Sequence, residues 1–339
     1  MFAFLVFIGR FQPFHIGHAR VLQQALAQSA QVIVLIGSAK QARNTRNPFT
    51  IEERTEMILG SLKPEDAARV HCQPLHDCLY NDAVWVTNVQ EAVQEVVSKH
   101  SAMMNPRIGL IGHQKDQSSY YLRLFPQWES VDVENHHALS ATPLREGYLL
   151  GQMPAQDVLP QGTVNLLQNF QSQEVYHSLR EEARFIQQYK QAWDVAPYTP
   201  TFVTVDAVVV QSGHILLVER KARPGKGLFA LPGGFVDQGE TLINACIREL
   251  REETRLKVPE PVLHGSLKGQ RVFDDPYRSA RGRTITHAFM FDLKPDTSLP
   301  KVKGGDDAKS AFWLPLSALQ PERLFEDHFH IIRAMTGMY

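Results

Sequence analysis

The sequence predicts an α/β protein in which a doubly wound parallel sheet is followed by a second domain of mixed α+β type. Three features of the chain support this prediction. Apolar runs alternate with helical patterns over the first half, whereas the second half begins with two adjacent strand patterns, a glycine-rich loop and one long helix. Between the halves lies WDVAPYTPT, residues 193–201, with two prolines and no helical period. The 339 residues suffice for two domains with separate cores.

The first half is predicted to form the parallel sheet. Strands are expected at the apolar runs 2–8, 31–37, 69–75, 107–112 and 130–135. Helices are expected at 19–28, 51–62 and 83–100, where apolar residues recur three or four positions apart, with two more within 161–193. Continuous apolar strands alternating with helices favour a parallel sheet that is covered on both faces.

These patterns place a first domain at 1–192, a linker at 193–201 and a second domain at 202–339. In the second domain, strands are expected at 201–210 and 214–220, around the turn QSG. A glycine-rich loop and a long helix follow, and then strands near 262–267 and at 283–292.

The composition argues against several classes of protein. A formal net charge of −1 offers no basic surface, so neither nucleic acid nor a membrane is expected as a partner. The first apolar run, FAFLVFI, has no basic segment before it, unlike a signal peptide, and no run is long enough for a transmembrane helix. Three cysteines suggest no disulfide framework and favour the cytoplasm. HCQPLHDC, residues 71–78, contains no CxxC pair, so zinc is not favoured there. A homo-oligomer is compatible with the sequence.

Polar and basic side chains follow every predicted strand of the first half. In a doubly wound sheet, ligands bind outside the carboxyl ends of the strands, so these residues are expected to converge on one site. The basic ones are Arg10, His15, His18, Lys40, Arg43, Arg54, Lys115 and Arg145.

Two of these segments also have the pattern of a helix start. Thr50 and Glu53 fit a capping box that places Arg54 on the first turn. In SATPLR, Thr142 is expected as the N-cap, with proline at the next position and Arg145 as a forked donor. A helix N-terminus with an arginine can bind an anion, although a well-capped helix alone would explain the pattern equally well.

The motif GRFQPFHIGH, residues 9–18, is more specific. It places His15 and His18 where the first strand gives way to a helix, and Gly17 between them allows a phosphate to approach the backbone. The two imidazoles can donate hydrogen bonds to phosphate oxygens. A lone histidine is usually structural, but this pair and its glycine indicate a phosphate site.

GRFQPFHIGH together with SATPLR resembles the HxGH nucleotidylyltransferase superfamily, which has a Rossmann-like sheet. With GSA at 37–39 and NPFTIEER at 47–54, the first 190 or so residues are similar to nicotinamide mononucleotide (NMN) adenylyltransferases. The resemblance implies that ATP and NMN are the substrates, that NAD and pyrophosphate are the products, and that Mg²⁺ accompanies the nucleotide.

The resemblance also implies roles for residues of this chain. His15 and His18 would hold the ATP phosphates and stabilise the transition state, with Arg145 as a third catalytic residue. Trp85 would stack on the nicotinamide ring beside Asn81 or Asp82, although a core aromatic on a helix face explains the tryptophan equally well. The complete set expected to bind ATP or NMN comprises Gly9, Arg10, Phe11, Gly17, Ser38, Arg54, Asn81, Trp85, Ser140 and Thr142. Arg10, Arg54 and Arg145 would contact phosphates, and Ser140 and Thr142 would cap the same site.

A second motif, GGFVDQGETLINACIRELREETRL, occupies residues 233–256. On a helix, Glu249, Glu252 and Glu253 are three and four positions apart, so their carboxylates share one face. Without a cation such like-charged neighbours repel one another, and oxygen-only ligands at this density suit Mg²⁺ or Mn²⁺. A solvated acidic helix face is the alternative interpretation. The spacing of the three glutamates from Gly234 and Glu240 argues against it.

This segment resembles the Nudix box of nucleoside diphosphate hydrolases. The resemblance implies that Glu249, Glu252 and Glu253 are catalytic metal ligands, with the Gly234 carbonyl available. Arg255 replaces the usual glycine at the helix end, where it should cost about 1 kcal/mol of backbone strain or shift the cap. The catalytic base stays open among Asp274, Asp275, Asp306 and Asp307, and the arginines that could bind substrate phosphate are Arg278, Arg281 and Arg283.

The two modules together resemble the bifunctional NMN adenylyltransferase/Nudix hydrolase family, in which the second activity is associated with ADP-ribose. Two alternatives remain. The first is an HxGH transferase for another nucleotide or a sugar phosphate, joined to a housecleaning Nudix domain. The second is a non-catalytic Nudix domain that senses ADP-ribose. The sequence leaves open the choice between NMN and its nicotinic acid analogue, and any coupling between the sites.

Overall fold

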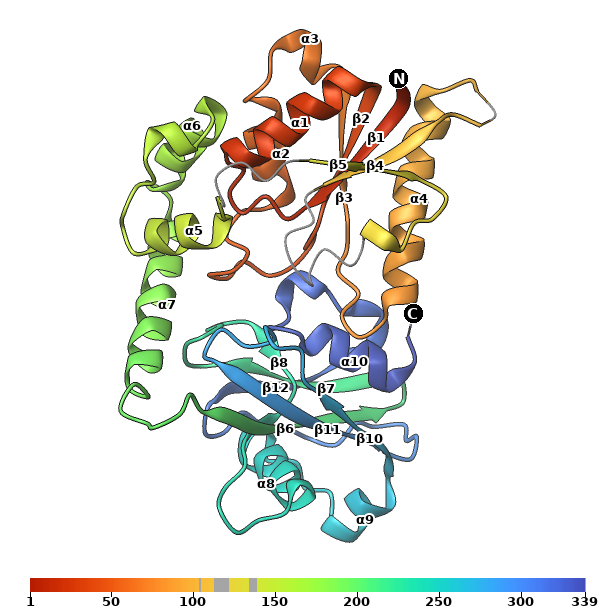
Figure 1. The fold of residues 1–339 in the computed structure, drawn as a ribbon. Coiled ribbons are helices and arrows are strands. Elements are labelled where there is room, and N and C mark those ends of the chain that lie inside the picture. The colour runs from red at the N-terminus through yellow and green to blue at the C-terminus, as the bar shows by residue number, and fades with distance from the viewer. Residues whose placement is uncertain (104, 113–121, 134–138, 339) are drawn as a thin grey trace. The chain divides into compact units, whose positions relative to one another are not determined.

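The computed structural model describes residues 1–103, 105–112, 122–133 and 139–338, so Lys115 lies outside the described part. The chain forms two compact units, residues 1–183 and 184–339 (Figure 1). The helix Glu174–Gln191 (α7) runs across the boundary, and the segment 193–201 belongs to the second unit. Among the described residues, no helix combines the length and apolar character needed to cross a bilayer.

The first unit contains a five-stranded parallel sheet of order β3-β2-β1-β4-β5. Its strands are β1 (Phe2–Gly9), β2 (Ser29–Ile36), β3 (Val70–Pro74), β4 (Ile108–Gly112) and β5 (Glu129–Asp132). In the register, Phe4 lies opposite Gln31 on β2 and Ile108 on β4. The chain therefore runs outward from β1 in both directions, which confirms the predicted doubly wound sheet.

Helices cover both faces of this sheet (Figure 1). They are α1 (Ile16–Gln28), α2 (Ile51–Leu59), α3 (Pro64–Ala67), α4 (Asp82–His100), α5 (Ala141–Leu149), α6 (Gln161–Phe170) and α7, with a 3-10 turn at Gln156–Val158. Side chains of β1 alternate between two cores: Leu5 and Phe7 pack with α1, α2 and α6, whereas Phe4 and Val6 pack with α4. This arrangement fixes β1 at the centre and leaves its carboxyl end open to loops.

The second unit contains a seven-stranded mixed sheet of order β10-β11-β6-β7-β12, with two short strands attached at its side. The strands are β6 (Thr201–Gln211), β7 (His214–Arg220), β8 (Phe229–Ala230), β9 (Gly233–Phe235), β10 (Leu267–Phe273), β11 (Arg283–Asp292) and β12 (Ala308–Pro315). Only the β11–β6 pair is parallel. Helix α8 (Leu242–Thr254) packs on the face of β6 that carries Val205 and Ala207.

One predicted strand of this unit is wrong. Residues 262–267 were expected to be extended, but the chain forms helix α9 (Glu260–Gly265) and the strand begins only at Leu267. Pro259 and Pro261 fit the start of a helix, because the first-turn N–H groups have no acceptor within the helix. Helix α10 (His328–Thr336) and the 3-10 turns Leu316–Ala318 and Pro321–Arg323 complete the unit.

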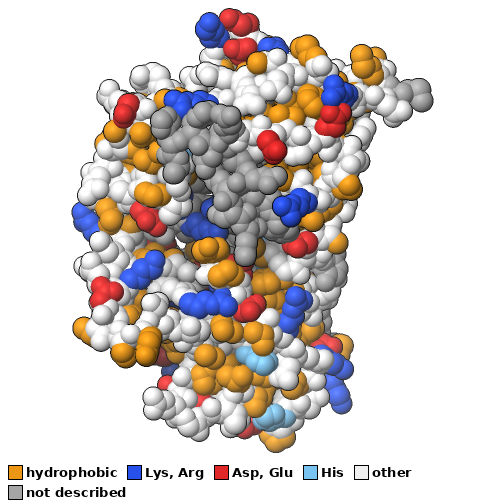
Figure 2. All heavy atoms as spheres, viewed as in Figure 1, with side chains coloured by type: hydrophobic (Ala, Val, Ile, Leu, Met, Phe, Trp, Pro, Cys, Tyr) orange, Lys and Arg blue, Asp and Glu red, His pale blue; other side chains and the backbone are white. Residues whose placement is uncertain are grey.

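Acidic and basic side chains are interspersed on the face shown in Figure 2. No single-sign patch dominates that view, in keeping with a net charge of −1. Binding of a phosphate-rich molecule would therefore depend on local groups.

Candidate active sites

Helix α1 begins at the HIGH motif, as the sequence predicts. His15 is the N-cap, and its Nδ1 accepts the Gly17 N–H at 3.1 Å, while the His15 N–H donates to Nδ1 of His18 at 3.3 Å. Because both Nδ1 atoms accept, each neutral imidazole carries its proton on Nε2. The rings stack with their centroids 3.7 Å apart. The motif thus gives two Nε2–H donors at one helix N-terminus.

Aromatic rings hold His18 in place. The ring centroids of Phe11 and Phe14 lie 5.0 and 5.7 Å from that of His18. Phe11 adopts φ +54°, and a Cβ on Gly9 would lie 2.7 Å from its ring, so only glycine fits at position 9. Gly9 and Phe11 therefore shape the histidine site, and their contact with a nucleotide stays a prediction.

Two of the predicted phosphate-binding arginines are buried and hold backbone carbonyls. Arg54, 1% exposed, donates Nη1 to the carbonyls of Arg10 (2.9 Å) and Gly37 (2.6 Å), and Nε to Thr50 O (3.0 Å). Thr50 forms the predicted capping box with Glu53. Arg54 therefore ties the loops after β1 and β2 to α2, and direct contact with phosphate remains a prediction for it.

Arg145 reaches across the same loops. Its Nη1 donates to Gln12 O at 2.8 Å, its Nε to Thr45 O at 3.1 Å, and its Nη2 to the Thr142 hydroxyl at 3.4 Å. Gln12, which sequence reasoning missed, is 1% exposed and exchanges two hydrogen bonds with the backbone of Phe49. Arg43, also expected at this edge, is paired with Glu53 at 2.7 Å.

The buried guanidinium groups of this unit repel one another. Burial, with a contribution from Arg46, lowers the pKa of Arg10 to about 10, although Asp77 opposes the change. Burial likewise lowers the pKa of Arg145 to about 10, with Arg10 and Arg46 contributing. Burial also lowers the pKa of Arg54 to about 10, and Arg10 adds to this although Asp77 opposes it. Positive charges gathered in this way raise the electrostatic energy of the protein, and a bound anion would lower it. The cluster is therefore suited to binding an anion.

A single carboxylate organises the loop after β2. Asp77 accepts the backbone N–H (3.0 Å) and the hydroxyl (2.7 Å) of Ser38, and also the side chain of Gln41 (2.9 Å). Ser38 has φ +51°, which this pair of hydrogen bonds supports. Asp77 was not predicted as a site residue, although it lies in the loop after β3, where the same sheet-edge argument would have identified it.

The start of α5 differs from the prediction. Ser140, and not Thr142, is the N-cap, and its side chain makes no capping hydrogen bond. Thr142 and Pro143 occupy the second and third helical positions, where proline is tolerated because those N–H groups lack an intrahelical acceptor. The Thr142 hydroxyl accepts from Arg145 instead of capping the helix.

Asn81 and Trp85 lie at the start of α4. The Asn81 side chain caps the helix by accepting the Val84 N–H at 3.2 Å, which makes Asp82 the first helical residue. Trp85 is half-buried and packs against the core beneath α4, with its ring centroid 6.1 Å from that of Phe125. The structure therefore supports a packing role for Trp85, and stacking on nicotinamide stays a prediction.

In the second unit, Glu249 lies against the glycine loop. A Cβ on Gly234 would lie 2.6 Å from Oε1 of Glu249, so glycine is required for that carboxylate to reach the loop. Burial raises the pKa of Glu249, and Glu252 and Asp306 add to the rise, although Arg248 opposes it. Glu249 and the loop backbone thus meet as the motif predicts.

Glu253 is the most buried of the three carboxylates, at 8% exposed. Its Oε2 accepts the Gly233 N–H at 3.1 Å. Burial raises its pKa to about 8, with Glu249 and Asp307 contributing. A divalent cation would offset this cost, so the oxygen-only set of Glu249, Glu252, Glu253 and the Gly234 carbonyl fits Mg²⁺ or Mn²⁺.

An arginine of the motif bridges the carboxylates. Arg248 donates to Glu240 (2.7 Å), Glu249 (2.8 Å) and Glu252 (3.1 Å). Within the described ranges, no group of three or more His, Cys, Asp or Glu side chains has the arrangement of a metal site. Arg248 thus contacts one oxygen each of Glu249 and Glu252 and offsets the repulsion between the carboxylates.

Arg255 ends α8 in the left-handed conformation, with φ +52°. The cap has not shifted, so the first of the two predicted outcomes, local strain, is the one observed. The Arg255 side chain packs against Gly305, where a Cβ would lie only 2.6 Å from its Nε. The absence of a side chain at position 305 therefore leaves space for the arginine.

The predicted base and phosphate residues separate into two groups. Asp306 and Asp307 are close enough to raise the pKa of Glu249 and Glu253, respectively. Asp274 instead pairs with Arg283 (3.9 Å), and Asp275 accepts the Tyr277 N–H at 2.8 Å. The loop between β11 and β12 therefore brings Asp306 and Asp307 near the carboxylates of α8, whereas Asp274 and Asp275 have partners in the loop after β10.

Arg278, one of the arginines that could bind substrate phosphate, is buried and paired with a carboxylate. Its Nε and Nη2 each donate to Asp327 at 2.9 Å, and Nη2 lies 3.9 Å from Asp206. Asp206 also accepts from the Thr286 hydroxyl at 2.6 Å and lies 3.9 Å from His328. This buried network, which the sequence did not reveal, holds the loop 278–283 against α10.

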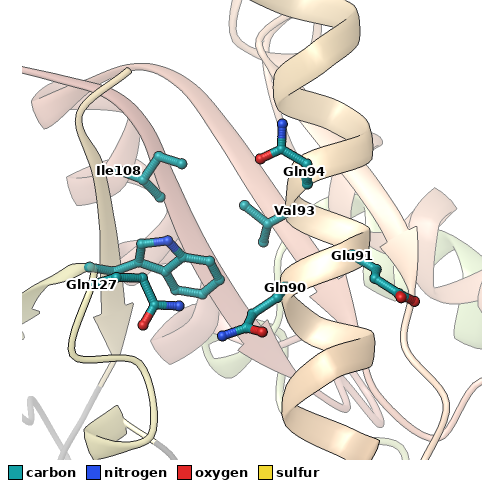
Figure 3. Close-up of a pocket in the computed structure, with 7 residues that line it drawn as sticks. Gln90, Glu91, Val93, Gln94, Ile108 and Gln127 are labelled. Atoms are coloured by element: carbon teal, nitrogen blue, oxygen red, sulfur yellow. The ribbon is translucent and has the colours of Figure 1, made fainter. Parts of the chain in front are cut away.

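A pocket lies apart from both motif sites, between α4 and the start of β4 (Figure 3). Its lining includes Gln90, Val93 and Gln94 from the helix, Ile108 from the strand, and Trp128. It contains none of the predicted site residues and no cluster of ionisable groups, so we assign no chemistry to it.

Two family models match the chain: a cytidylyltransferase-like model over residues 6–101 and a NUDIX domain model over residues 200–335. A nicotinamide/nicotinic acid mononucleotide adenylyltransferase of Acinetobacter baylyi is 46% identical over 184 residues, covering 54% of this chain and 94% of the relative. An ADP-ribose pyrophosphatase of Methanocaldococcus jannaschii is 42% identical over 136 residues, covering 40% of this chain and 73% of the relative.

One solved structure is similar over nearly the full chain. It is a bifunctional NMN adenylyltransferase/ADP ribose pyrophosphatase of Francisella tularensis in complex with AMP and a manganese ion. It is 38% identical, with a TM-score of 0.93, and the alignment covers 99% of each chain. The similarity therefore extends over both units and the segment that joins them.

Proposed function

The chain belongs to the family of bifunctional NMN adenylyltransferase/ADP-ribose pyrophosphatases, and we propose that it makes NAD from ATP and NMN with one unit and hydrolyses ADP-ribose with the other. Adenylyl transfer is assigned to the domain predicted at 1–192 and hydrolysis to the domain at 202–339, joined by 193–201. The observation that carries the proposal is the gathering of phosphate-directed groups at two separate places in the chain.

The first of these places is the carboxyl end of β1 and β2. Two Nε2–H donors at the start of α1 lie on the same loops that Arg54 and Arg145 hold in place. Arg10, whose guanidinium group makes no hydrogen bond among the described residues, is the best placed of the arginines to contact phosphate directly. Arg54 and Arg145 position the loops through backbone carbonyls and add positive charge.

The transfer requires positioning and charge, with no covalent step on the protein. A phosphate oxygen of NMN forms a bond to the α-phosphorus of ATP, the bond from that phosphorus to the bridging oxygen breaks, and pyrophosphate leaves. Charge that develops on the departing oxygens is stabilised by the His15 and His18 donors and by the arginines. No side chain serves as a nucleophile, and Mg²⁺ bound to the nucleotide is expected as part of the substrate.

The second place is the acidic face of α8. Glu249, Glu252, Glu253 and the Gly234 carbonyl would hold Mg²⁺ or Mn²⁺, which when bound supplies charge neutralisation and an activated water. Water adds to one phosphorus of ADP-ribose, the bond to the bridging oxygen breaks, and AMP and ribose 5-phosphate are released. Asp306 or Asp307, which are near enough to raise the pKa of Glu249 and Glu253, would take the proton from that water. The Gly233 N–H donates a hydrogen bond to Glu253, and the absence of a side chain at Gly234 allows Glu249 to approach the loop backbone.

The proposal includes substrates and surroundings that follow from this chemistry. ATP, NMN and ADP-ribose are the small-molecule partners, and the cytoplasm is the expected location. Neither nucleic acid nor a membrane is part of the proposal, and a homo-oligomer is compatible with it.

An acceptor panel tests the proposal. Purified wild-type protein is incubated with ATP, Mg²⁺ and either NMN, nicotinic acid mononucleotide or a sugar phosphate, and pyrophosphate release is measured. In parallel, ADP-ribose with Mg²⁺ is assayed for AMP. We expect NAD from NMN, and AMP from ADP-ribose. Turnover with a sugar phosphate alone would reject the first activity, and binding of ADP-ribose without hydrolysis would replace the second with a sensor.

A further inference from the structure

A histidine outside both motifs contacts the chain that leads into the glycine pair of the Nudix unit. His328, at the start of α10, is 6% exposed, and its Nδ1 accepts the Leu231 N–H at 2.9 Å. Leu231 is itself buried, so the imidazole replaces water as the acceptor of this N–H. Gly234, whose backbone lies against Glu249, follows Leu231 by three positions. His328 is therefore bonded to the backbone directly before the predicted metal loop.

This segment is held from both faces of the mixed sheet. Helices α8 and α10 lie on opposite faces (Figure 1). On the side of α8, the Gly233 N–H donates to Glu253 at 3.1 Å, and within the sheet the Ala207 N–H donates to Pro232 O at 2.8 Å. On the side of α10, the imidazole accepts the N–H of the residue before Pro232. Each of three consecutive residues thus has one backbone group fixed, and α10 supplies one of these three contacts.

A buried carboxylate fixes the orientation of the imidazole. Because Nδ1 accepts, the proton of the neutral ring is on Nε2, which lies 3.9 Å from Oδ1 of Asp206. A Cβ on Gly233 would lie 2.9 Å from the same oxygen. The other oxygen of Asp206 accepts the Thr286 hydroxyl at 2.6 Å. Asp206 is therefore held in place close to both the ring and the loop backbone.

The charges around His328 keep its ring neutral. Burial lowers the pKa of His328 to about 3, with nearby arginines contributing, although Asp327 opposes the change. A protonated imidazole would donate from both nitrogens and could not accept a backbone N–H. Asp327 accepts two hydrogen bonds of 2.9 Å from Arg278, which fixes the chain at the start of α10. Nδ1 is therefore an acceptor in a fixed position near neutral pH.

We propose that His328 is a positioning residue of the Nudix unit, which holds the glycine loop where the Gly233 N–H and the Gly234 carbonyl meet the carboxylates of α8. The role rests on the proposed metal-dependent hydrolysis and extends it to a helix outside the motif. His328 acts through the backbone of the loop and not through contact with the cation. Without its acceptor the buried Leu231 N–H is unpaired, so the loop rearranges until that N–H reaches water, and Gly234 moves relative to Glu249.

Two amide variants separate the acceptor from the rest of the side chain. In asparagine, Oδ1 is as many bonds from the backbone as Nδ1 of histidine, so His328→Asn can still accept the Leu231 N–H. In glutamine the amide atoms are at the bond distance of Nε2, so His328→Gln leaves that N–H unpaired. His328→Leu removes every polar atom. Thr336→Val, which removes the hydrogen bond from the Thr336 hydroxyl to Ile332 O within α10, is the matched control.

Titration of the full chain with Mn²⁺ in the absence of nucleotide, followed by electron paramagnetic resonance, gives both the Kd and the number of sites. In His328→Gln and His328→Leu the Kd should rise roughly 10- to 100-fold, the range for loss of a residue that orients metal ligands, with the wild-type number of sites. ADP-ribose hydrolysis at limiting Mg²⁺ should fall with it, and NAD formation should not change. His328→Asn and Thr336→Val should keep the wild-type Kd.

Two results would overturn the positioning role: a wild-type Kd in His328→Gln, including one with fewer sites because folded protein is lost, or equal Kd values in the two amide variants. If His328→Leu does not fold, the amide variants still decide. Absence of Mn²⁺ binding and of ADP-ribose hydrolysis in the wild type would instead overturn the proposed activity. Amide hydrogen exchange of residues 229–236 then tests the role without metal: faster exchange in His328→Gln than in His328→Asn supports it, and equal exchange contradicts it.

Discussion

Replacement of Gly234 by alanine should disable one activity and preserve the other. The added Cβ would lie 2.6 Å from Oε1 and 2.7 Å from Cδ of Glu249, whereas ordinary contact begins near 3.4 Å. The carboxylate must therefore withdraw by close to 1 Å. Because it is the free end of a flexible side chain, the fold can accommodate this shift. Metal–ligand distances tolerate only about 0.2 Å, and a misplacement of about 1 Å at a reacting centre costs on the order of 10²-fold in rate.

Both reactions of one protein preparation measure the effect. Gly234→Ala should lower ADP-ribose hydrolysis on the order of 10²-fold at saturating Mg²⁺, with NAD formation and thermal stability unchanged. Gly269→Ala is the control, since a Cβ there meets nothing within 4 Å. Hydrolysis at the wild-type rate in Gly234→Ala would refute the argument that Glu249 must reach the loop at this point.

Three further predictions follow from buried charge and backbone strain. Burial raises the pKa of Glu253 to about 8, so metal binding must release its proton. The Kd for Mn²⁺, measured by electron paramagnetic resonance, should therefore fall about tenfold per pH unit up to pH 8 and then level off. In Glu253→Gln this dependence should weaken to the part that Glu249 contributes. Arg255→Gly should raise the free energy of unfolding of the second unit by about 1 kcal/mol in a denaturant titration, with hydrolysis unchanged, and a loss of stability would contradict the strain at φ +52°. Arg54→Lys should lower both NAD formation and the melting temperature, because lysine cannot donate hydrogen bonds to several carbonyls in the geometry of a guanidinium group. Arg10→Lys should lower NAD formation alone. Equal melting temperatures for the two variants would contradict the structural role of Arg54.

The same proton equilibrium affects stability without metal. The pKa of Glu253 in the folded protein is above its unfolded value of about 4.5, so between pH 4.5 and about 8 the folded state holds a proton that the unfolded state has released. The stability contributed by the neutral carboxyl is complete below pH 4.5 and is lost as the pH rises toward 8. A bound cation removes this penalty.

Long periodic elements could be predicted from the sequence, and short ones could not. The parallel strands and α4 carry clear apolar periods, and their observed bounds agree to within a few residues. β8 and β9 have two and three residues and exist only through pairing with β7 and β6. The error at 262–267 arose because Val262 and Leu263 read as a strand, although the prolines flanking Glu260 favour a helical turn.

The candidate sites could be located by motif, but the partners of their side chains could not. Arg54 and Arg145 were expected to contact phosphate, and the structure places their guanidinium groups on backbone carbonyls of the loop after β1. Backbone carbonyls leave no signature in a sequence. Gln12 and Asp206 are likewise buried against partners 37 and 80 positions away, a separation at which no local pattern predicts a contact.

A product assay of three proteins tests the central claim that one chain handles phosphate at two independent sites. Wild type, His18→Ala and Glu253→Gln are each supplied with ATP and NMN, and separately with ADP-ribose, in the presence of Mg²⁺. We expect His18→Ala to lose NAD formation and to release AMP at the wild-type rate, and Glu253→Gln to show the reverse. Loss of both products in either variant, or of neither, would contradict the account.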